Sequence, residues 1–332
     1  MSNSYYDVTA VGNAIVDMIS FVDDAFLVEH GLNKGTMTLI DLEQSKRLFE
    51  AASGLDGSMT QQSGGSAANT MAGIASFGGR CSYIGKTADD ETGKIFHRDM
   101  TGQGIDFNTN TDNELGLPTA KCMIFVTPDA ERTMATYLGV STELAPDDLD
   151  AAKIRNAQVT YLEGYLFDKE LAKEAFHAAS IMAHTAGRLV ALTLSDPFCV
   201  DRHRQDFQAL IDGHVDILFA NEQELLSLYQ TESWDDALER VGKTVSVCAA
   251  TKGEKGATIL FHGQRFEIAA SPVDKLVDTT GAGDMFAAGF LYGFTQGMTP
   301  QQCGELGARA AASIISHVGA RPEIVFKTLL DA

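Results

Sequence analysis

The pattern of apolar and polar positions divides most of the chain into short apolar runs and longer amphipathic stretches. Six runs rich in β-branched and aromatic residues predict strands buried on both faces: 7–12, 81–85, 159–164, 189–196, 215–221 and 245–253. Stretches with helical spacing between them predict helices at 66–79, 169–187 and 202–213. This alternation favours a mostly parallel sheet with helices on both faces, in which ligands bind at the carboxyl ends of the strands.

Two regions depart from this alternation. Residues 15–41 and 116–138 hold β-rich runs interrupted by the turn sequences GLNKG and TPDAE, and we expect them to pair into a small β lid outside the main sheet. Residues 285–332 are predicted to be almost wholly helical. Because no repeat or linker divides the chain, we predict one α/β domain over residues 1–332, with the lid formed by about 15–41 and 116–138.

Composition narrows the classes of partner. The chain has 25 Lys and Arg against 45 Asp and Glu, a net charge of −20, which disfavours binding to nucleic acid or to acidic membrane surfaces. The five cysteines are scattered and form no CxxC pair, which fits neither a disulfide framework nor a zinc site. No stretch approaches the ~20 apolar residues of a membrane span, and the N-terminus has no leader pattern. We therefore expect a cytoplasmic protein, whose oligomeric state the sequence leaves open.

The segment DTTGAGDMFAAGF, residues 278–290, carries the clearest candidate chemistry. We expect residues 275–280 to end a strand, 281–283 to form a tight turn, and a helix to follow from Met285. Amides of such a turn at a helix start form an anion site. Taken alone, Asp284 is a helix cap. Beside an anion site it can accept the proton of an attacking hydroxyl group, while the amides of Ala282, Gly283 and Asp284 stabilise a phosphoryl group in transfer.

Two other phosphate-binding motifs are excluded. GAGDMF lacks the third glycine of a dinucleotide fingerprint, and its carboxylate would repel a pyrophosphate. GRCSYIGKT, residues 79–87, has five residues between its glycines, whereas a Walker loop has four. We interpret this second segment as a strand followed by a turn.

The motifs carry a family resemblance. Residues 278–290 resemble the C-terminal signature of the ribokinase (PfkB) family of carbohydrate and nucleoside kinases, and SGGSAANTMAGIASFGG (63–79) followed by YIGKTADDETG (83–93) resembles its N-terminal signature. The likeness covers essentially the whole chain. Within the family, residues 12–17, 117–139 and 194–224 look most similar to adenosine kinases. The resemblance implies a ribokinase-like three-layer α/β/α fold with a mostly parallel central sheet and a small β lid. It also implies ATP- and Mg²⁺-dependent phosphorylation of a nucleoside, with the 5′-hydroxyl of adenosine as the predicted acceptor and AMP as the product.

The resemblance also implies roles for individual residues. Asp284 would be the general base, and Gly281, Ala282 and Gly283 the anion hole. Ribose hydroxyls would be held by a set of polar and glycine positions: Asn13, Asp17, Gly64, Gly65 and Asn69. From spacing alone, Asp17 is a polar strand end and GGSAAN is a helix start, so these assignments depend on the family match.

On the nucleotide side, Asn221 and Glu224 resemble the family's NxxE motif, in which Glu224 would bind Mg²⁺ through water. The same pattern is a helix capping box, and both interpretations can hold together. Residues 250–261 are predicted to form a hairpin that brings Lys252, Gly253 and Gly256 to ATP, although a solvated turn lysine is an equal alternative. A K⁺ site near Asp278, Thr280 and residues 313–319 also stays open.

Arg132, in the predicted lid turn, resembles an arginine that adenosine kinases bring over the phosphates when the lid closes. The default for such a residue is an exposed hairpin arginine.

The base pocket is the least defined part of the resemblance. In EGYLFD, residues 163–168, Leu166 takes the position of an aromatic ring in adenosine kinases, so Tyr165 or Phe167 would have to replace that ring, and we predict Tyr165 as a substrate residue. The alternatives are a ribokinase- or fructokinase-like sugar kinase, decided by the pocket beside residues 165–167 and Met37, and a non-catalytic nucleoside- or sugar-binding regulator. An intact GAG turn followed by Asp284 argues against the regulator.

Overall fold

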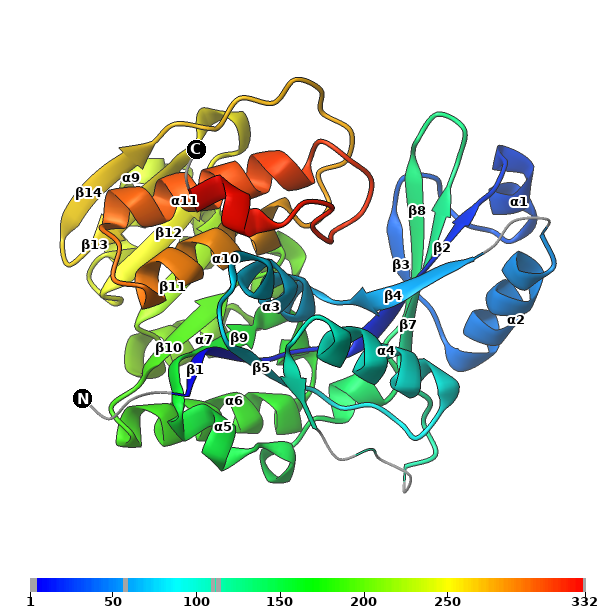
Figure 1. Cartoon of the computed structure of the whole chain (residues 1–332), viewed down its shortest axis with the longest axis horizontal. Helices are drawn as coiled ribbons and strands as arrows, with labels where there is room; N and C mark the ends of the chain where they lie inside the picture. Colours follow the sequence, from blue (N-terminus) through cyan, green and yellow to red (C-terminus); the bar gives the residue numbers. More distant parts are fainter. Residues whose placement is uncertain (1–4, 56–58, 109–110, 112–114, 331–332) are drawn as a thin grey trace.

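A large, mostly parallel sheet forms one side of the molecule in the computed structural model (Figure 1), which describes residues 5–55, 59–108, 111 and 115–330. Within these residues, nine strands lie in the order β14-β13-β12-β11-β10-β9-β1-β5-β6, and only the β12–β13 and β13–β14 pairs are antiparallel. The strands are β1 (Tyr6–Val11), β5 (Cys81–Ile84), β6 (Asp106–Phe107), β9 (Ala157–Glu163), β10 (Leu189–Thr193), β11 (Ile217–Asn221), β12 (Val247–Thr251), β13 (Ala257–Phe261) and β14 (Gln264–Ile268).

Alternate residues of these strands enter two separate cores, one on each face of the sheet. Val8 and Ala10 of β1 pack in one core and Val11 in the other. The first core is covered by α3 (Ser66–Phe77), α4 (Glu91–Gly102), α10 (Ala282–Thr295) and α11 (Pro300–Ile314). The second is covered by α5 (Ala151–Arg155), α6 (Glu170–Thr185), α7 (Pro197–His214), α8 (Glu222–Tyr229) and α9 (Trp234–Val241). The strands are apolar on both faces because both faces are buried.

A second, smaller sheet stands beside the first (Figure 1). Among the described residues it has five strands in the order β3-β8-β7-β2-β4: β2 (Ile15–Phe21), β3 (Met37–Leu39), β4 (Thr60–Gly64), β7 (Ala120–Val126) and β8 (Arg132–Tyr137). Helices α1 (Asp24–Glu29) and α2 (Leu42–Ser53) pack on one face of it. Strands β2, β3, β7 and β8 lie in the segments predicted to form the lid, whereas β4 lies outside them.

Short 3₁₀ helices complete the described elements: Gly139–Glu143, Pro146–Asp148, Gly164–Asp168 (η3), Gly253–Lys255 and Phe326–Leu330. All six predicted strands and all three predicted helices are confirmed, with shifts at their ends that are largest for α7, which begins at Pro197 rather than at residue 202. The predicted hairpin at 250–261 is also confirmed, because β12 and β13 pair antiparallel on either side of Gly253–Lys255.

Two predictions near the C-terminus are wrong. Residues 275–280 form no strand, and the amides of Val277 and Asp278 instead donate to the carbonyl of Ile315 in a loop. Leu276, which made the segment look like a strand, is 62% exposed. Residues 315–325 are also not helical, so the C-terminal region is interrupted by a loop. This loop supplies contacts to the candidate site.

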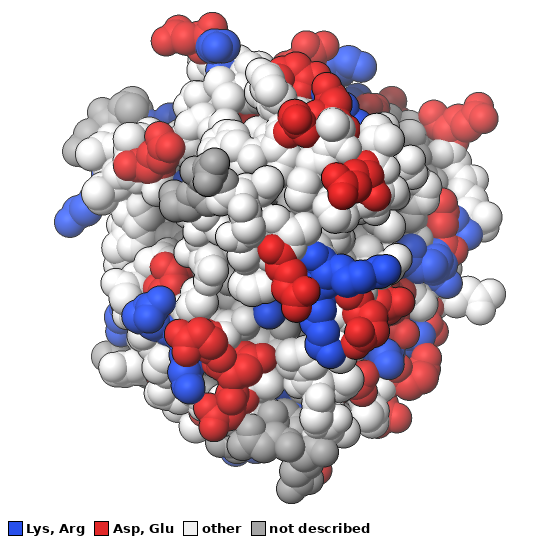
Figure 2. Space-filling model, turned by 90° about the vertical axis from the view of Figure 1, so that its right-hand side faces the viewer, with Lys and Arg blue, Asp and Glu red and all other residues white. Residues whose placement is uncertain are grey.

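The charged side chains on the surface and the state of the cysteines agree with what the composition predicts. Figure 2 shows acidic and basic side chains interspersed on the face that it presents. All five cysteines are buried free thiols. Among the described helices, none combines the length and the apolar character that a membrane-spanning segment requires.

Candidate active site

The start of helix α10 offers two free amides. Gly281 precedes the helix with φ +79°, and a Cβ added to it would lie 2.8 Å from the Cβ of Ala320, so both conformation and space require glycine here. The amide of Ala282 donates to the carbonyl of Thr279 at 3.2 Å. Within the described chain, no protein group accepts a hydrogen bond from the amides of Gly283 and Asp284. These two donors, at the positive end of the helix dipole, are available to an anion.

Asp284 lies in the first turn of α10 and points to a different helix. Its carboxylate accepts hydrogen bonds from Ser66 Oγ at 2.6 Å and Asn69 Nδ2 at 3.0 Å, both in α3, and Gly281 rather than Asp284 occupies the N-cap position. Burial raises the pKa of Asp284 above its usual range, while the two hydrogen bonds and the charge of Arg321 act in the opposite direction. The helix-cap alternative therefore does not describe this side chain.

Asn69 carries an unused acceptor. Its side chain is buried, and while Nδ2 donates to Asp284, Oδ1 has no partner among the described residues. An orphaned buried carbonyl costs on the order of 1–3 kcal/mol. A hydroxyl group of a ligand would satisfy this atom, and it would do so next to Asp284.

Asp17 of β2 faces the same place. A Cβ on Gly64 would lie 2.4 Å from the Asp17 carboxylate, so only glycine allows this approach. Burial raises the pKa of Asp17 to about 6, with Arg321 and Arg132 lowering it and Asp284 raising it. The two carboxylates therefore lie within electrostatic range of each other.

Gly65 fixes the turn between β4 and α3. Its φ is +92°, and an added Cβ would lie 2.5 Å from the carbonyl oxygen of Asn13. The two glycines predicted to contact a sugar thus also have packing reasons to be glycine.

Both polar ends of the Asn13 side chain have protein partners. Its side chain is 1% exposed, Nδ2 donates to Glu163 at 2.8 Å, and Oδ1 accepts from Ser141 Oγ at 3.0 Å. Glu163 also lies at the end of a strand, β9, although no sequence motif marks it as a site residue. Its carboxylate accepts a hydrogen bond from the amide of Ala67 at 2.7 Å. Burial raises the pKa of Glu163 to about 7. Asn13 and Glu163 therefore connect the end of β1 to the start of α3.

Arg132 reaches out of the small sheet. At the start of β8, its guanidinium forms an ion pair with Asp278, and both side chains are nearly buried. Asp278 also accepts from the amides of Thr280 and Gly319, each at 2.9 Å. Arg132 Nε is buried without a partner among the described residues. The small sheet is thus attached to the segment that leads into the GAG turn.

The residues predicted for the nucleotide side have local partners. Asn221 and Glu224 form the reciprocal capping box at the start of α8, and burial raises the pKa of Glu224 to about 7. The ammonium of Lys252 lies 3.3 Å from Glu222 and 4.5 Å from the ring of Trp234. Lys252 is therefore neither the solvated lysine of one alternative nor free to follow a ligand without breaking these contacts.

The two glycines of the same hairpin differ. Gly256 is required by the fold, because a Cβ there would lie 2.0 Å from the carbonyl of Ile268, whereas a Cβ on Gly253 would meet open space. The backbone at Gly253 is accordingly the part of the hairpin that a ligand can approach.

The structure separates the candidates for the base pocket. Leu166 and Phe167 are each 1% exposed, and Phe167 stacks on Phe207 with ring centroids 4.2 Å apart. Tyr165 is 38% exposed, and Phe198, at the start of the helix α7 that packs on η3, is 72% exposed. The partial burial of Tyr165, together with the charges of Asp196, Asp284, Glu224 and Glu163, raises its pKa. Tyr165 therefore lies within electrostatic range of Asp284, at the start of α10, and of Glu224, at the start of α8.

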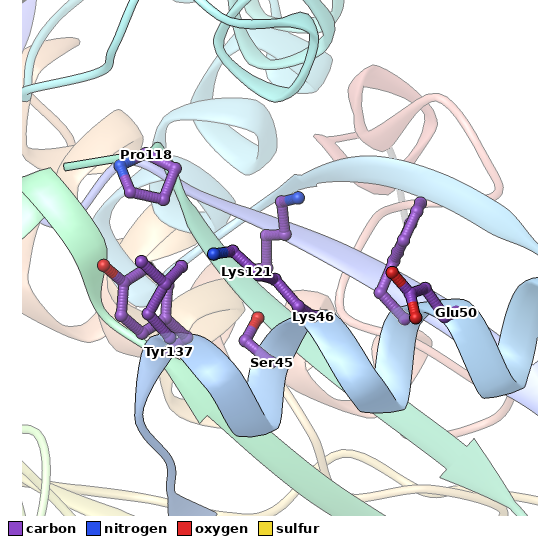
Figure 3. Close-up of a pocket in the computed structure, with 8 residues that line it drawn as sticks. Ser45, Lys46, Glu50, Pro118, Lys121 and Tyr137 are labelled. Atoms are coloured by element: carbon purple, nitrogen blue, oxygen red, sulfur yellow. The ribbon is translucent and has the colours of Figure 1, made fainter. Parts of the chain in front are cut away.

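A separate cavity lies on the other face of the small sheet. Figure 3 shows it between α2 and strands β7 and β8, with Lys46, Lys121 and Tyr137 among its lining residues and a volume of about 160 Å³. Cys122 is paired with Asp17 in the register, so these two side chains lie on the same face of the small sheet. Lys121, one residue before Cys122, therefore points to the opposite face from Asp17. The cavity is thus distinct from the site around Asp284.

Comparisons with known proteins identify the family. The model of the pfkB family of carbohydrate kinases matches residues 35–325, and the chain therefore belongs to this family. The fold class predicted from sequence is confirmed, and the protein is an ATP-dependent kinase of nucleosides or carbohydrates.

Individual relatives divide between two kinds of acceptor. The solved structure of an adenosine kinase from Sinorhizobium meliloti matches this structure with a TM-score of 0.88 and covers 98% of each chain. The two sequences are 46% identical. A probable sugar kinase from Rhizobium etli is 45% identical, with a TM-score of 0.89 and coverage of 99% of this chain and 98% of that one. An uncharacterised sugar kinase from Archaeoglobus fulgidus is 30% identical over 253 residues, 75% of this chain and 96% of its own length.

Proposed function

We propose that the protein transfers the γ-phosphoryl group of ATP to the 5′-hydroxyl of adenosine, giving AMP and ADP. The observation that carries the proposal is the convergence of Asp284, the unpartnered Oδ1 of Asn69 and the carboxylate of Asp17 beside two free amides at the start of α10. This arrangement combines a proton acceptor, acceptors for sugar hydroxyls and donors for an anion. A phosphoryl transfer to one hydroxyl of a sugar-containing substrate uses all three.

The proposed reaction assigns one task to each group. Asp284 accepts the proton of the primary hydroxyl as its oxygen attacks the γ-phosphorus, and the bond from that phosphorus to the leaving ADP oxygen breaks. The amides of Gly283 and Asp284 stabilise the charge on the phosphoryl oxygens. Asp17 and Asn69 Oδ1 accept hydrogen bonds from the ribose hydroxyls, which fixes the acceptor for in-line attack.

The oxygen groups near the proposed phosphate site are compatible with Mg²⁺. The described residues contain no preformed cluster of three or more His, Cys, Asp or Glu side chains, which fits an ion held mainly by phosphates and water. Glu224 is buried, and although Asn221 occupies one direction of each carboxylate oxygen, further lone pairs can accept from metal-bound water. Mg²⁺, when bound, would neutralise phosphate charge; Glu224 would orient its water shell.

Two exposed aromatic rings favour a nucleoside over a free sugar. Tyr165 and Phe198 expose large apolar surfaces on neighbouring elements at the end of the sheet where Asp284 lies. A flat purine can stack on such rings, whereas a plain sugar gains less from them. The similarity to an adenosine kinase over nearly the whole chain supports the same acceptor. The similarity to a probable sugar kinase makes a sugar kinase the second candidate.

An acceptor panel tests the proposal. Adenosine, guanosine, inosine, ribose and fructose are each incubated with ATP and Mg²⁺, and ADP formation and the phosphorylated product are measured. Adenosine is expected to give the highest kcat/KM, with AMP as the product. Turnover of free sugars alone would replace the nucleoside proposal with the sugar kinase, and adenosine binding without any turnover would support the non-catalytic regulator.

A further inference from the structure

A loop near the C-terminus, in which Gly319 and Ala320 are buried, makes several contacts with the candidate site. Arg321 donates from Nε to the carbonyl of Ser63 at 3.0 Å, from Nη1 to the carbonyl of Ala68 at 2.9 Å, and from Nη2 to both the carbonyl and the hydroxyl of Ser63 at 2.7 Å. Ser63 and Ala68 flank Gly64, Gly65 and the start of α3. One guanidinium thus fastens both ends of the segment that carries the acceptor-side glycines.

The two preceding residues touch the other parts of the site. The amide of Gly319 donates to Asp278, the partner of Arg132, at 2.9 Å. Ala320 packs against Gly281, where any larger side chain would clash with it. Three consecutive residues, Gly319, Ala320 and Arg321, therefore contact the anchor of the small sheet, the anion-binding turn and the acceptor segment.

Arg321 is also the cation that faces the two site carboxylates. Four ionisable groups from four elements surround it: Asp17 of β2, Tyr83 of β5, Asp99 of α4 and Asp284 of α10. Asp99 itself is used by Ser63, whose amide donates to it at 2.7 Å. Arg132 also lowers the pKa of Asp17, and Asp284 in turn raises the pKa values of its neighbours Tyr161, Glu163 and Tyr165. Arg321 is therefore the cation that acts on both Asp17 and Asp284.

We propose that Arg321 is a positioning residue for the phosphoryl transfer, which holds the segment that carries Gly64, Gly65 and Asn69 in place beside Asp284. This proposal rests on one part of the proposed function: that Asp284 acts as the base and that Asp17 accepts hydrogen bonds from substrate hydroxyl groups. It adds a residue 37 positions after Asp284 in the chain that touches neither substrate in this account.

The test uses Arg321→Gln and Arg321→Lys in the full-length protein, with kcat/KM for the acceptor found in the panel measured from pH 5 to 9. Arg321→Gln should lower kcat/KM at neutral pH by at least ~10-fold and move the acidic limb of the pH profile upward by at least about half a pH unit, because a nearby positive charge is lost. Arg321→Lys should keep the limb where it is in the wild type and lower kcat/KM by at least ~3-fold, because an ammonium cannot reproduce the guanidinium fork.

A matched control separates these effects from a general loss of stability. Arg204 donates from Nε to the carbonyl of Ser227 at 2.8 Å and is 23% exposed, so Arg204→Gln removes a similar arginine whose hydrogen bonds go to Ser227 and Asp201. It should leave the pH profile unchanged. A folded Arg321→Gln variant, as judged by urea unfolding, with a wild-type pH limb would overturn the proposal. If Arg321→Gln does not fold, wild-type kcat/KM in Arg321→Lys would overturn it.

The two proposals fail in different ways. If the wild type phosphorylates a sugar rather than adenosine, the nucleoside proposal fails and the Arg321 test proceeds with that sugar. If the wild type turns over adenosine and the Arg321 variants behave like the wild type, only the positioning role fails.

Discussion

Arg132 of the small sheet forms a nearly buried ion pair with Asp278, in the segment just before the GAG turn. The pair joins the two sheets at the edge of the candidate site, and Asp278 is held at the same time by the amides of Thr280 and Gly319. We infer that Arg132 keeps the small sheet over the acceptor. The unpartnered Nε of Arg132 leaves a donor that a phosphate could use.

Arg132→Gln should lower kcat for the acceptor by at least ~10-fold, because closure over the site and a cation near the phosphates are both lost. It should also raise the apparent pKa of Asp17, which Arg132 lowers. Steady-state kinetics across pH measure both effects. The control is Lys34→Gln, which removes an exposed ion pair with Asp129 in the turn that precedes β8. Equal losses in the two variants would show that Arg132 only stabilises the small sheet.

The rate at acidic pH should report Asp17. Its pKa is raised to about 6 by burial, so below about pH 6 the carboxyl is protonated and accepts hydrogen bonds less well. We expect kcat/KM to fall as pH decreases through 6. Asp17→Asn should lower kcat/KM at pH 8 by at least ~10-fold and remove the acidic limb near pH 6, because the group that titrates there is gone. An unchanged limb would assign the ionisation to another group.

Glu163 should make stability depend on pH. Burial raises its pKa from 4.5 to about 7, so the folded protein binds its proton more tightly than the unfolded chain does. Its stabilising contribution is therefore complete below about pH 4.5 and is lost as pH rises to about 7. The free energy of unfolding of the wild type relative to Glu163→Gln should fall by on the order of 3 kcal/mol over that range. Urea unfolding at pH 4.5 and pH 8 measures the difference, and a constant difference would contradict the prediction.

The exposed aromatic rings should matter for a nucleoside and not for a sugar. Tyr165→Leu and Phe198→Leu should each raise KM for adenosine by about 5- to 160-fold, since stacking on a base is worth ~1–3 kcal/mol, while leaving turnover of ribose unchanged. Leu171, which is 48% exposed on α6, offers a control as Leu171→Ala. If neither aromatic substitution changes KM for adenosine, the base binds elsewhere.

The sequence predicts the main sheet well because its strands are buried on both faces and therefore stand out as apolar runs. Strand β4 was missed, since TQQSG is polar and belongs to a strand only through its pairing with β2. Residues 275–280 were assigned wrongly for the opposite reason, because an apolar pair, Leu276 and Val277, lies in a loop. Local pattern cannot report a tertiary partner.

The candidate site shows the same limit. The GAG turn and Asp284 are legible in the sequence because a turn, a carboxylate and a helix follow one another directly. Arg321 is a lone arginine in a loop, and its contacts with Ser63 and Ala68, about 250 residues earlier, exist only in the folded chain. Phe167 was a reasonable stacking candidate until its contact with Phe207 placed it in the core.

Asp284→Asn tests the central claim most directly. Asparagine keeps the shape, because its oxygen can accept from Asn69 Nδ2 while its nitrogen donates to Ser66 Oγ, but it cannot take the proton of the acceptor hydroxyl. Isothermal titration should show adenosine binding within about 3-fold of the wild type, while kcat falls by at least ~100-fold, the scale expected when a general base is lost. The matched control Asp41→Asn, at the cap of α2, should leave both unchanged. Near-normal turnover by Asp284→Asn would contradict the account.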